Sequence, residues 1–253
     1  MLRTQKLGEA DRIVTLLCRQ NGRVRAVAKG VRRTKSRFGA RLEPFTHVDL
    51  MIHPGRSLDV ITQAEAIRAY GPPLAADYPK YTAGAAMLET AERLTPVEKE
   101  PAIRQFLLLI GGLRALGEAA EPASSLDPGP TDPSAAIGRD HRLVLDAYFL
   151  RSLAVAGYAP SLGECARCGS TDRRLTAFAI GSGGMVCESC RPPGAASPGP
   201  ETITLMQALL RGDWDNAMRS ERRHRVECSG LVAAYLQWHL EHSIRSLRHV
   251  ERA

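Results

Sequence analysis

The first quarter of the chain alternates apolar and polar positions in short runs, which is the pattern of half-buried β-strands. Two such runs, 12–19 and 23–28, are joined by the hairpin turn Gln20-Asn21-Gly22. Two further runs, 46–53 and 58–63, are joined by a Pro-Gly turn. Short antiparallel strands leave exposed edges unless their sheet closes, so this part of the chain predicts a small β-barrel.

From Asp77 onward, apolar residues recur at every third or fourth position, which is the period of amphipathic helices. We expect helices over the following ranges: 77–94, 101–116, 140–156 and 204–212. A last helix shows the same period in its apolar residues: Val232, Leu236, Leu240, Ile244 and Leu247. Segments 117–135 and 192–200 are rich in Pro, Gly, Ala and Ser, and they predict exposed connectors. The chain is therefore predicted to be α+β, with a barrel domain over 1–70 and a helical domain over 71–253.

Positive charge is concentrated in the predicted barrel domain. The whole chain has 34 Lys and Arg against 27 Asp and Glu, a net charge of +7. Residues 1–68 contain fourteen basic and six acidic side chains, and no acidic residue lies between Asp11 and Glu43. Like charges repel one another and destabilise the compact state unless a polyanion neutralises them. The distribution favours nucleic acid as the partner, and an acidic protein, a membrane surface or simple solvation are the alternatives.

Eight basic residues on the second strand and the loop over 30–42 form the candidate DNA-binding site: Arg23, Arg25, Lys29, Arg32, Arg33, Lys35, Arg37 and Arg41. Together they would form a groove that follows a phosphate backbone. Phe38 and Phe45 are the only aromatic residues between positions 1 and 69, so base stacking would be limited there. We expect binding that depends steeply on salt and hardly at all on base sequence.

Four of the six cysteines have the spacing of a metal site. Cys165 and Cys168 form one C-x₂-C pair, Cys187 and Cys190 form another, and 18 residues separate the pairs. Two such turns complete a tetrahedral shell of four sulfurs, which suits one Zn²⁺ ion. Because this shell leaves no open position for a substrate, the ion is expected to be structural. Iron–sulfur ligation, redox use of one pair and four unrelated cysteines are the alternatives.

Catalytic motifs are incomplete in this sequence. The segment Gly30-x₄-Lys35-Ser36 lacks the glycine that precedes the lysine of a phosphate-binding loop, and His239 and His242 lack the spacing of H-E-x-x-H. Charged residues are frequent among the first dozen positions, so the sequence does not predict a signal peptide. No apolar run is long enough to cross a bilayer, so the sequence does not predict a membrane span. We expect a cytoplasmic protein that is not an enzyme and has no membrane partner.

Several segments form a recognisable combination: residues 7–17, 22–33 and 36–45, Tyr81-Thr82-Ala83-Gly84, the four-cysteine pattern, and residues 230–236. In combination they resemble the RecO family of bacterial recombination mediators. The resemblance implies an N-terminal OB-fold, a helical C-terminal domain and a zinc-ribbon-like insertion at about 160–195. It also implies binding of single- and double-stranded DNA, annealing of complementary strands, and help, together with RecR, in loading RecA onto SSB-coated DNA at the bacterial nucleoid.

The family pattern also raises two points about this chain. Only six residues precede Leu7, and this length favours a barrel without its first strand, through a true absence or a start codon assigned too late. The acidic, apolar-ended C-terminal tail of SSB is an implied partner, with Arg245 and Arg248 as candidate contacts.

The alternative function is a zinc-ribbon transcription or RNA-binding factor, which would show sequence selectivity or a preference for the 2′-hydroxyl.

Overall fold

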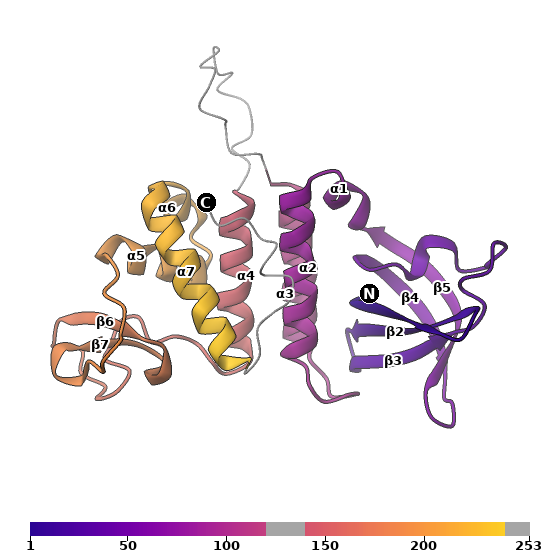
Figure 1. Cartoon of the computed structure of the whole chain (residues 1–253), viewed down its shortest axis with the longest axis horizontal. Helices are drawn as coiled ribbons and strands as arrows, with labels where there is room; N and C mark the ends of the chain where they lie inside the picture. Colours follow the sequence, from indigo (N-terminus) through magenta and orange to yellow (C-terminus); the bar gives the residue numbers. More distant parts are fainter. Residues whose placement is uncertain (120–139, 241–253) are drawn as a thin grey trace, which may run out of the picture. The chain divides into compact units, whose positions relative to one another are not determined.

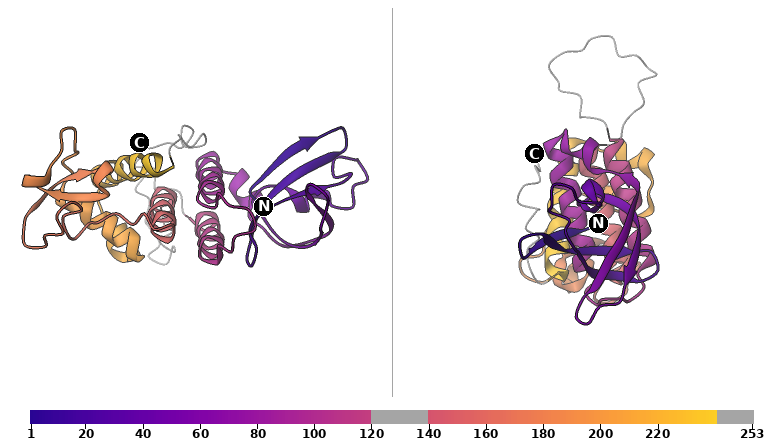
Figure 2. Two further views of the ribbon diagram at one scale, coloured as in Figure 1. Left: turned by 90° about the horizontal axis from the view of Figure 1, so that it is seen from below. Right: turned by 90° about the vertical axis from the view of Figure 1, so that its right-hand side faces the viewer.

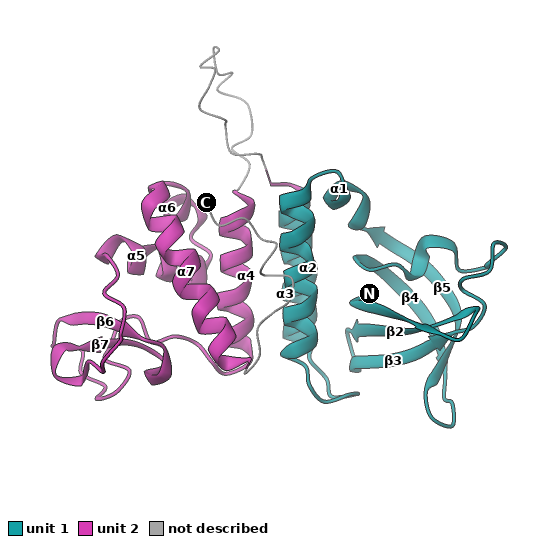
Figure 3. Ribbon diagram, viewed as in Figure 1, with its two compact units in different colours: residues 1–117, 244–250 teal, residues 118–243, 251–253 magenta. Residues whose placement is uncertain are grey.

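The computed structural model of the chain describes residues 1–119 and 140–240 (Figure 1). These residues divide into two compact units, the first formed by residues 1–117 and the second by the described residues that follow (Figure 3). The first unit contains a sheet and a helical hairpin, so it extends beyond residue 70. The domain limits 1–70 and 71–253 stay a prediction.

Five strands form the mixed sheet of the first unit: β1 (Arg3–Leu7), β2 (Asp11–Cys18), β3 (Gly22–Ala28), β4 (Thr46–His53) and β5 (Asp59–Ala69). Their order is β1-β2-β3-β5-β4, and every neighbouring pair is antiparallel except β3 and β5. Figure 2 shows the sheet curving round itself. This is the five-stranded, partly open barrel of an OB-fold, and the predicted α+β class is confirmed.

A first strand is present, so the interpretation that the barrel lacks one is wrong. Strand β1 pairs with β2 from Arg3 opposite Thr15 to Leu7 opposite Asp11. Six residues before Leu7 are enough because Gly8, at φ +57°, allows a tight turn into β2. The amino group of Met1 also donates a hydrogen bond to the carbonyl oxygen of Thr46 at 3.0 Å, which links the start of β1 to β4.

The core of the barrel includes residues from the predicted loop over 30–42. Phe38 and Leu42 are each 1% exposed and pack with Val14, Leu16 and other buried residues of the strands. Leu42 ends a short 3₁₀ helix, η1 (Gly39–Leu42). Burial of a large apolar side chain stabilises the fold by roughly 1.5–3 kcal/mol. These two side chains therefore hold the charged segment between them in a fixed position.

Three helices complete the first unit: α1 (Gly71–Ala75), α2 (Tyr78–Arg93) and α3 (Ile103–Gly117). As predicted, Asp77 caps α2, because its carboxylate accepts the backbone N–H of Lys80 at 3.0 Å. Helix α2 comes close to the barrel at Gly84, where an added Cβ would lie 3.0 Å from the ring of Phe45. We call residues 94–102, which join α2 to α3, the α2–α3 linker.

The second unit contains four helices among its described residues: α4 (His141–Val155), α5 (Pro200–Arg211), α6 (Trp214–Met218) and α7 (Arg222–His239). Helix α4 is buried along most of its length and packs against α5 and α7. Helix α5 begins at Pro200 and not at the predicted position 204, because proline fits the first turn of a helix. A small hairpin, β6 (Leu175–Ala179) and β7 (Gly184–Cys187), lies between α4 and α5 in the chain.

Some predicted features lie outside the described residues. These are most of the connector over 117–135, the apolar positions Ile244 and Leu247 of the last helix, and the candidate contacts Arg245 and Arg248. Among the helices that the structure describes, none has the length and apolar character needed to cross a membrane.

Candidate nucleic-acid interface and cysteine cluster

Residues 29–41, which we call the basic segment, are anchored to the turn between β1 and β2. The backbone N–H of Gly30 donates to the carboxylate of Asp11 at 2.7 Å, and the N–H of Arg32 donates to the carbonyl of Ala10 at 2.9 Å. The guanidinium of Arg32 also donates to the carbonyl of Glu9 at 2.8 Å. With Phe38 in the core, the segment is held from both sides, so its charges are preorganised on the surface.

Six of the eight predicted DNA-binding residues lie together on this segment and are exposed: Lys29, Arg32, Arg33, Lys35, Arg37 and Arg41. Among the residues that the structure describes, no carboxylate forms an ion pair with any of the six. Their charges are therefore not neutralised within the described part of the chain. A surface of this kind attracts phosphate groups and raises the rate of encounter with a polyanion.

Arg23 and Arg25 of β3 have intramolecular partners. The guanidinium of Arg23 donates to the carbonyl oxygen of Pro96, and that of Arg25 pairs with the carboxylate of Glu98. Both partners belong to the α2–α3 linker, whose Lys99 N–H also donates to the carbonyl of Arg23 at 2.8 Å. Arg23 and Arg25 therefore help to hold β3 against the α2–α3 linker. In this they differ from the six cations of the basic segment.

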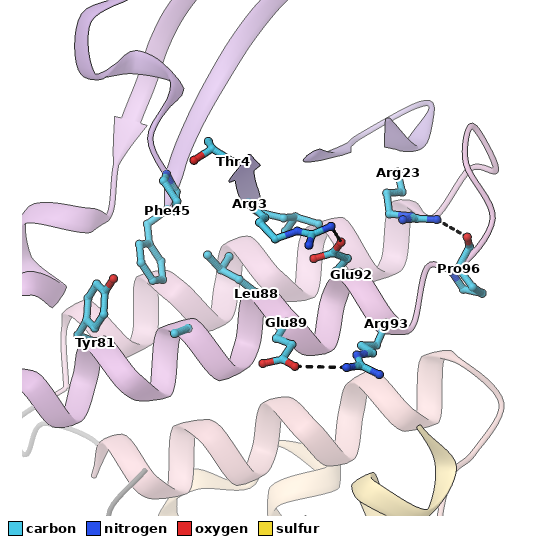
Figure 4. A pocket seen from close by; sticks show the side chains of 13 residues that line it. Arg3, Thr4, Arg23, Phe45, Tyr81, Leu88, Glu89, Glu92, Arg93 and Pro96 are labelled. Atoms are coloured by element: carbon cyan, nitrogen blue, oxygen red, sulfur yellow. Dashed lines mark hydrogen bonds and ion pairs between the residues drawn. The ribbon is translucent and has the colours of Figure 1, made fainter. Parts of the chain in front are cut away.

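The surroundings of Arg23 form a cavity of about 840 Å³ between the barrel and α2 (Figure 4). Arg3 pairs with Glu92 at 2.8 Å on one side of this cavity, and Arg93 pairs with Glu89 at 3.6 Å on the other. Each of these arginines meets a carboxylate of α2, so the ion pairs offset the charge of the cavity wall. This cavity is not part of the uncompensated surface made by the basic segment.

Neither of the two aromatic residues of the barrel offers a surface for base stacking. Phe38 is 1% exposed and Phe45 is 6% exposed. Phe45 packs against Tyr81 of α2, with ring centroids 5.5 Å apart. The burial of these two rings could not be predicted from the sequence, because a loop has no apolar period from which burial can be read.

The four predicted metal ligands come together, which confirms the clustering expected from their spacing. The sulfur atoms of Cys165, Cys168, Cys187 and Cys190 all lie within 4.8 Å of one another, and no other group of three or more His, Cys, Asp or Glu residues in the described part of the chain does so. Gly169, at φ +69°, closes the first turn by donating its N–H to the carbonyl of Cys165 at 2.8 Å.

The electrostatics of this cluster suit a bound cation. The backbone N–H of Cys187 donates to the sulfur of Cys165 at 3.4 Å and is the main cause that lowers the pKa of Cys165 to about 6. The neighbouring sulfurs, Cys187 first, and burial raise the pKa of Cys190 to about 12. Four thiolates cannot carry charge side by side without a compensating cation. The donor set, four sulfurs and no oxygen, is the one that tetrahedral zinc sites use.

Comparison with known proteins supports a single family over both units. Residues 1–70 match the family model "Recombination protein O N terminal", and residues 136–248 match "Recombination protein O C terminal". The chain is 62% identical over 253 residues to the DNA repair protein RecO of Thermobifida fusca (strain YX), covering 100% of this chain and 96% of that protein. It is 58% identical over 254 residues to RecO of a Nocardioides species, covering 100% of this chain and 97% of that protein.

A third relative gives the same result. The chain is 54% identical over 258 residues to the DNA repair protein RecO of Streptomyces coelicolor, covering 100% of this chain and 96% of that protein. These matches cover the whole of this chain and nearly the whole length of each relative. The chain therefore belongs to the RecO family of DNA repair and recombination proteins.

Proposed function

We propose that this protein binds single- and double-stranded DNA without sequence preference, anneals complementary strands, and helps load RecA onto SSB-coated DNA together with RecR. The observation that carries the DNA-binding part is the basic segment, where six exposed cations have no carboxylate partner among the described residues. Membership of the RecO family supports the part played in recombination. The protein makes and breaks no covalent bond in this role, so it acts without being an enzyme.

Annealing follows from the way in which the charges are presented. Cations that bind phosphates displace condensed counterions and reduce the repulsion between two strands. Phe38 and Phe45 are buried, so the barrel does not hold bases between aromatic rings. Base edges stay free to pair while the backbones are neutralised. This combination favours strand pairing over retention of separated strands.

We also propose that Cys165, Cys168, Cys187 and Cys190 hold one structural Zn²⁺ ion. When bound, zinc cross-links the two C-x₂-C turns, and in small zinc domains this contributes roughly 10–16 kcal/mol to the free energy of folding. The turn at Cys165 and Cys168 and the hairpin β6–β7 contain a small buried cluster of their own, with Ala177, Val186 and other small residues. Such a cluster is too small to fix the insertion by itself.

RecR, the C-terminal tail of SSB and, indirectly, RecA are the proposed protein partners, and no membrane partner is proposed. These partners and the chromosome would place the protein in the bacterial cytoplasm, at the nucleoid. The SSB tail needs a cationic and apolar contact surface. Arg245 and Arg248, the candidate contacts for this tail, lie outside the described residues.

Annealing assays test the proposal directly. Purified protein is mixed with two complementary strands in the absence of ATP, once with naked strands and once with strands coated by SSB. We expect pairing to be faster than the spontaneous rate in both cases. A protein that fails to anneal or to bind SSB-coated strands, and that instead selects a particular sequence or RNA over DNA, would be a transcription or RNA-binding factor and would contradict the proposal.

A further inference from the structure

A second, smaller cavity lies beside the basic segment. Its volume is about 530 Å³, and its wall includes Arg37 and Arg41 of the basic segment and Ala66 and Ala69 of β5. None of the described residues that line it is acidic. It is therefore an open space with two cations in its wall and no carboxylate to neutralise them. We call it the Arg37 pocket.

Arg37 makes a cation–π contact with a core residue of the barrel, Phe38. Its guanidinium carbon lies 4.9 Å from the centroid of the Phe38 ring. Phe38 is fixed in the core, whereas the Arg37 side chain is exposed. The 4.9 Å distance is that of a cation–π contact, and the part of the planar guanidinium that is exposed to solvent is available to a second flat group. Nucleic-acid bases stack on guanidinium planes as they do on aromatic rings.

Arg41 is positioned by the same turn. One terminal nitrogen of its guanidinium donates to the carbonyl oxygen of Arg37 at 2.8 Å. A guanidinium has five N–H donors, so the remaining ones are available to an anion. Arg41 thus presents a cation next to the planar guanidinium of Arg37. This pairing matches the two parts of a nucleotide, which are an anionic phosphate and a flat base.

The rest of the wall leaves room for such a ligand. Ala66 and Ala69 at the end of β5, and Gly39 and Ala40 at the start of η1, have small side chains or none. An added Cβ at Gly39 would meet no atom within 4 Å, so the space beside this residue is open. None of these four side chains has a hydrogen-bonding group. The two hydroxyl groups in the wall belong to Ser36 and Thr46, and Ser36 Oγ accepts the backbone N–H of Phe38 at 3.2 Å.

We propose that the Arg37 pocket binds one unpaired nucleotide of a single strand, with the base stacked on Arg37 and the phosphate bound by Arg41. The proposal rests on DNA binding by the basic segment and adds a preference for single-stranded over double-stranded DNA. In a duplex each base face is covered by the next base pair, so a duplex can offer this pocket only its phosphates. The pocket would give the barrel a stacking contact that Phe38 and Phe45 cannot give.

A charge-conserving substitution tests the proposal. Arg37→Lys keeps the positive charge but removes the plane, and Arg56→Lys is the control at an exposed arginine outside the basic segment, where neither affinity should change. Affinities are measured for oligothymidine and for a duplex of the same length, at the same salt concentration. We expect Arg37→Lys to weaken binding of the single strand by about fivefold or more and that of the duplex by less than about twofold.

Two further measurements keep the outcomes distinct. The salt dependence of both affinities should be the same in wild type and Arg37→Lys, because the charge is unchanged, and the melting temperature should show that the variant is folded. Equal effects on single strand and duplex, or no effect on either, would overturn the nucleotide pocket while DNA binding by the basic segment stands. If the wild-type protein binds neither substrate, the proposed function itself fails, and the pocket with it.

Discussion

The guanidinium of Arg25 pairs with the carboxylate of Glu98, and this ion pair joins strand β3 to the α2–α3 linker. A second ion pair, between Lys99 and Asp59 at 2.8 Å, joins the same linker to the start of β5. Basic residues of this barrel therefore differ in their partners. Those of β3 hold the first unit together, and those of the basic segment face solvent without carboxylate partners among the described residues.

This division predicts different effects of charge reversal on DNA binding. The combined change Arg32→Glu, Arg33→Glu and Lys35→Glu should abolish binding, with a loss of about 100-fold or more, because it replaces cations at the phosphate surface by anions. Arg25→Glu should weaken binding by less than about threefold. Fluorescence anisotropy with a labelled oligonucleotide measures both, and zinc content should be unchanged in both variants. Equal losses would show that β3 belongs to the DNA surface.

Substitution of Gly22 tests the contact between the barrel and the α2–α3 linker. An added Cβ at this residue would lie 1.6 Å from the carbonyl oxygen of Glu100, whereas at Gly39 it would meet no atom within 4 Å. Both glycines have positive φ, +58° and +52°, so alanine costs about 1 kcal/mol of backbone strain at either position. Gly22→Ala should cost about 2 kcal/mol more than Gly39→Ala because the linker must move. Urea unfolding of the two variants compares them directly. If the two losses are equal, the linker does not pack on β3.

The ion pair between Lys99 and Asp59 predicts a dependence of stability on pH. The hydrogen bond from Lys99 is the main cause that lowers the pKa of Asp59 below its usual value of 3.8. A lowered pKa in the folded state means that the stabilising effect is present above 3.8 and is lost as pH falls through the folded-state value. Wild type should therefore melt at a higher temperature than Lys99→Ala near neutral pH, and the difference should vanish in strong acid. A difference in melting temperature that grows toward acid pH would contradict this prediction.

The cysteine cluster predicts one zinc ion per chain. Cys187→Ser removes a ligand, so the variant should lose the ion and the hairpin β6–β7 should become accessible to protease. Cys228→Ala is the matched control, because Cys228 is buried in α7 and is not part of the cluster. Elemental analysis measures zinc, and DNA binding by the barrel should persist in both variants. A Cys187→Ser protein that keeps a full equivalent of zinc would contradict the proposed ligand set.

Features that depend on neighbouring residues could be predicted from the sequence. The strands β2, β3 and β4 follow from alternation and from the Asn21-Gly22 turn, because both act over a few residues. The cysteine cluster follows from two C-x₂-C pairs, since the geometry of each pair is local. Asp77 was recognised as a helix cap for the same reason.

Features that depend on distant partners could not be predicted. Nothing near Arg25 in the sequence indicates that Glu98, 73 positions later, neutralises it. The burial of Phe38 was also hidden, because it lies in a segment without apolar period. Strand β1 was missed because its residues Arg3–Leu7 are mostly exposed and show little alternation. In each case the structure depends on contacts with residues far away in the sequence, which the local sequence pattern does not reveal.

The most direct test of the account is the affinity of the wild-type protein for a single strand, measured over a series of salt concentrations. If the cations of the basic segment bind phosphates, the logarithm of the association constant should fall linearly with the logarithm of salt concentration, by about 0.7 for each phosphate bound. The slope should become shallower when Arg33 and Lys35 are both replaced by Gln. An affinity that does not change with salt would contradict the account.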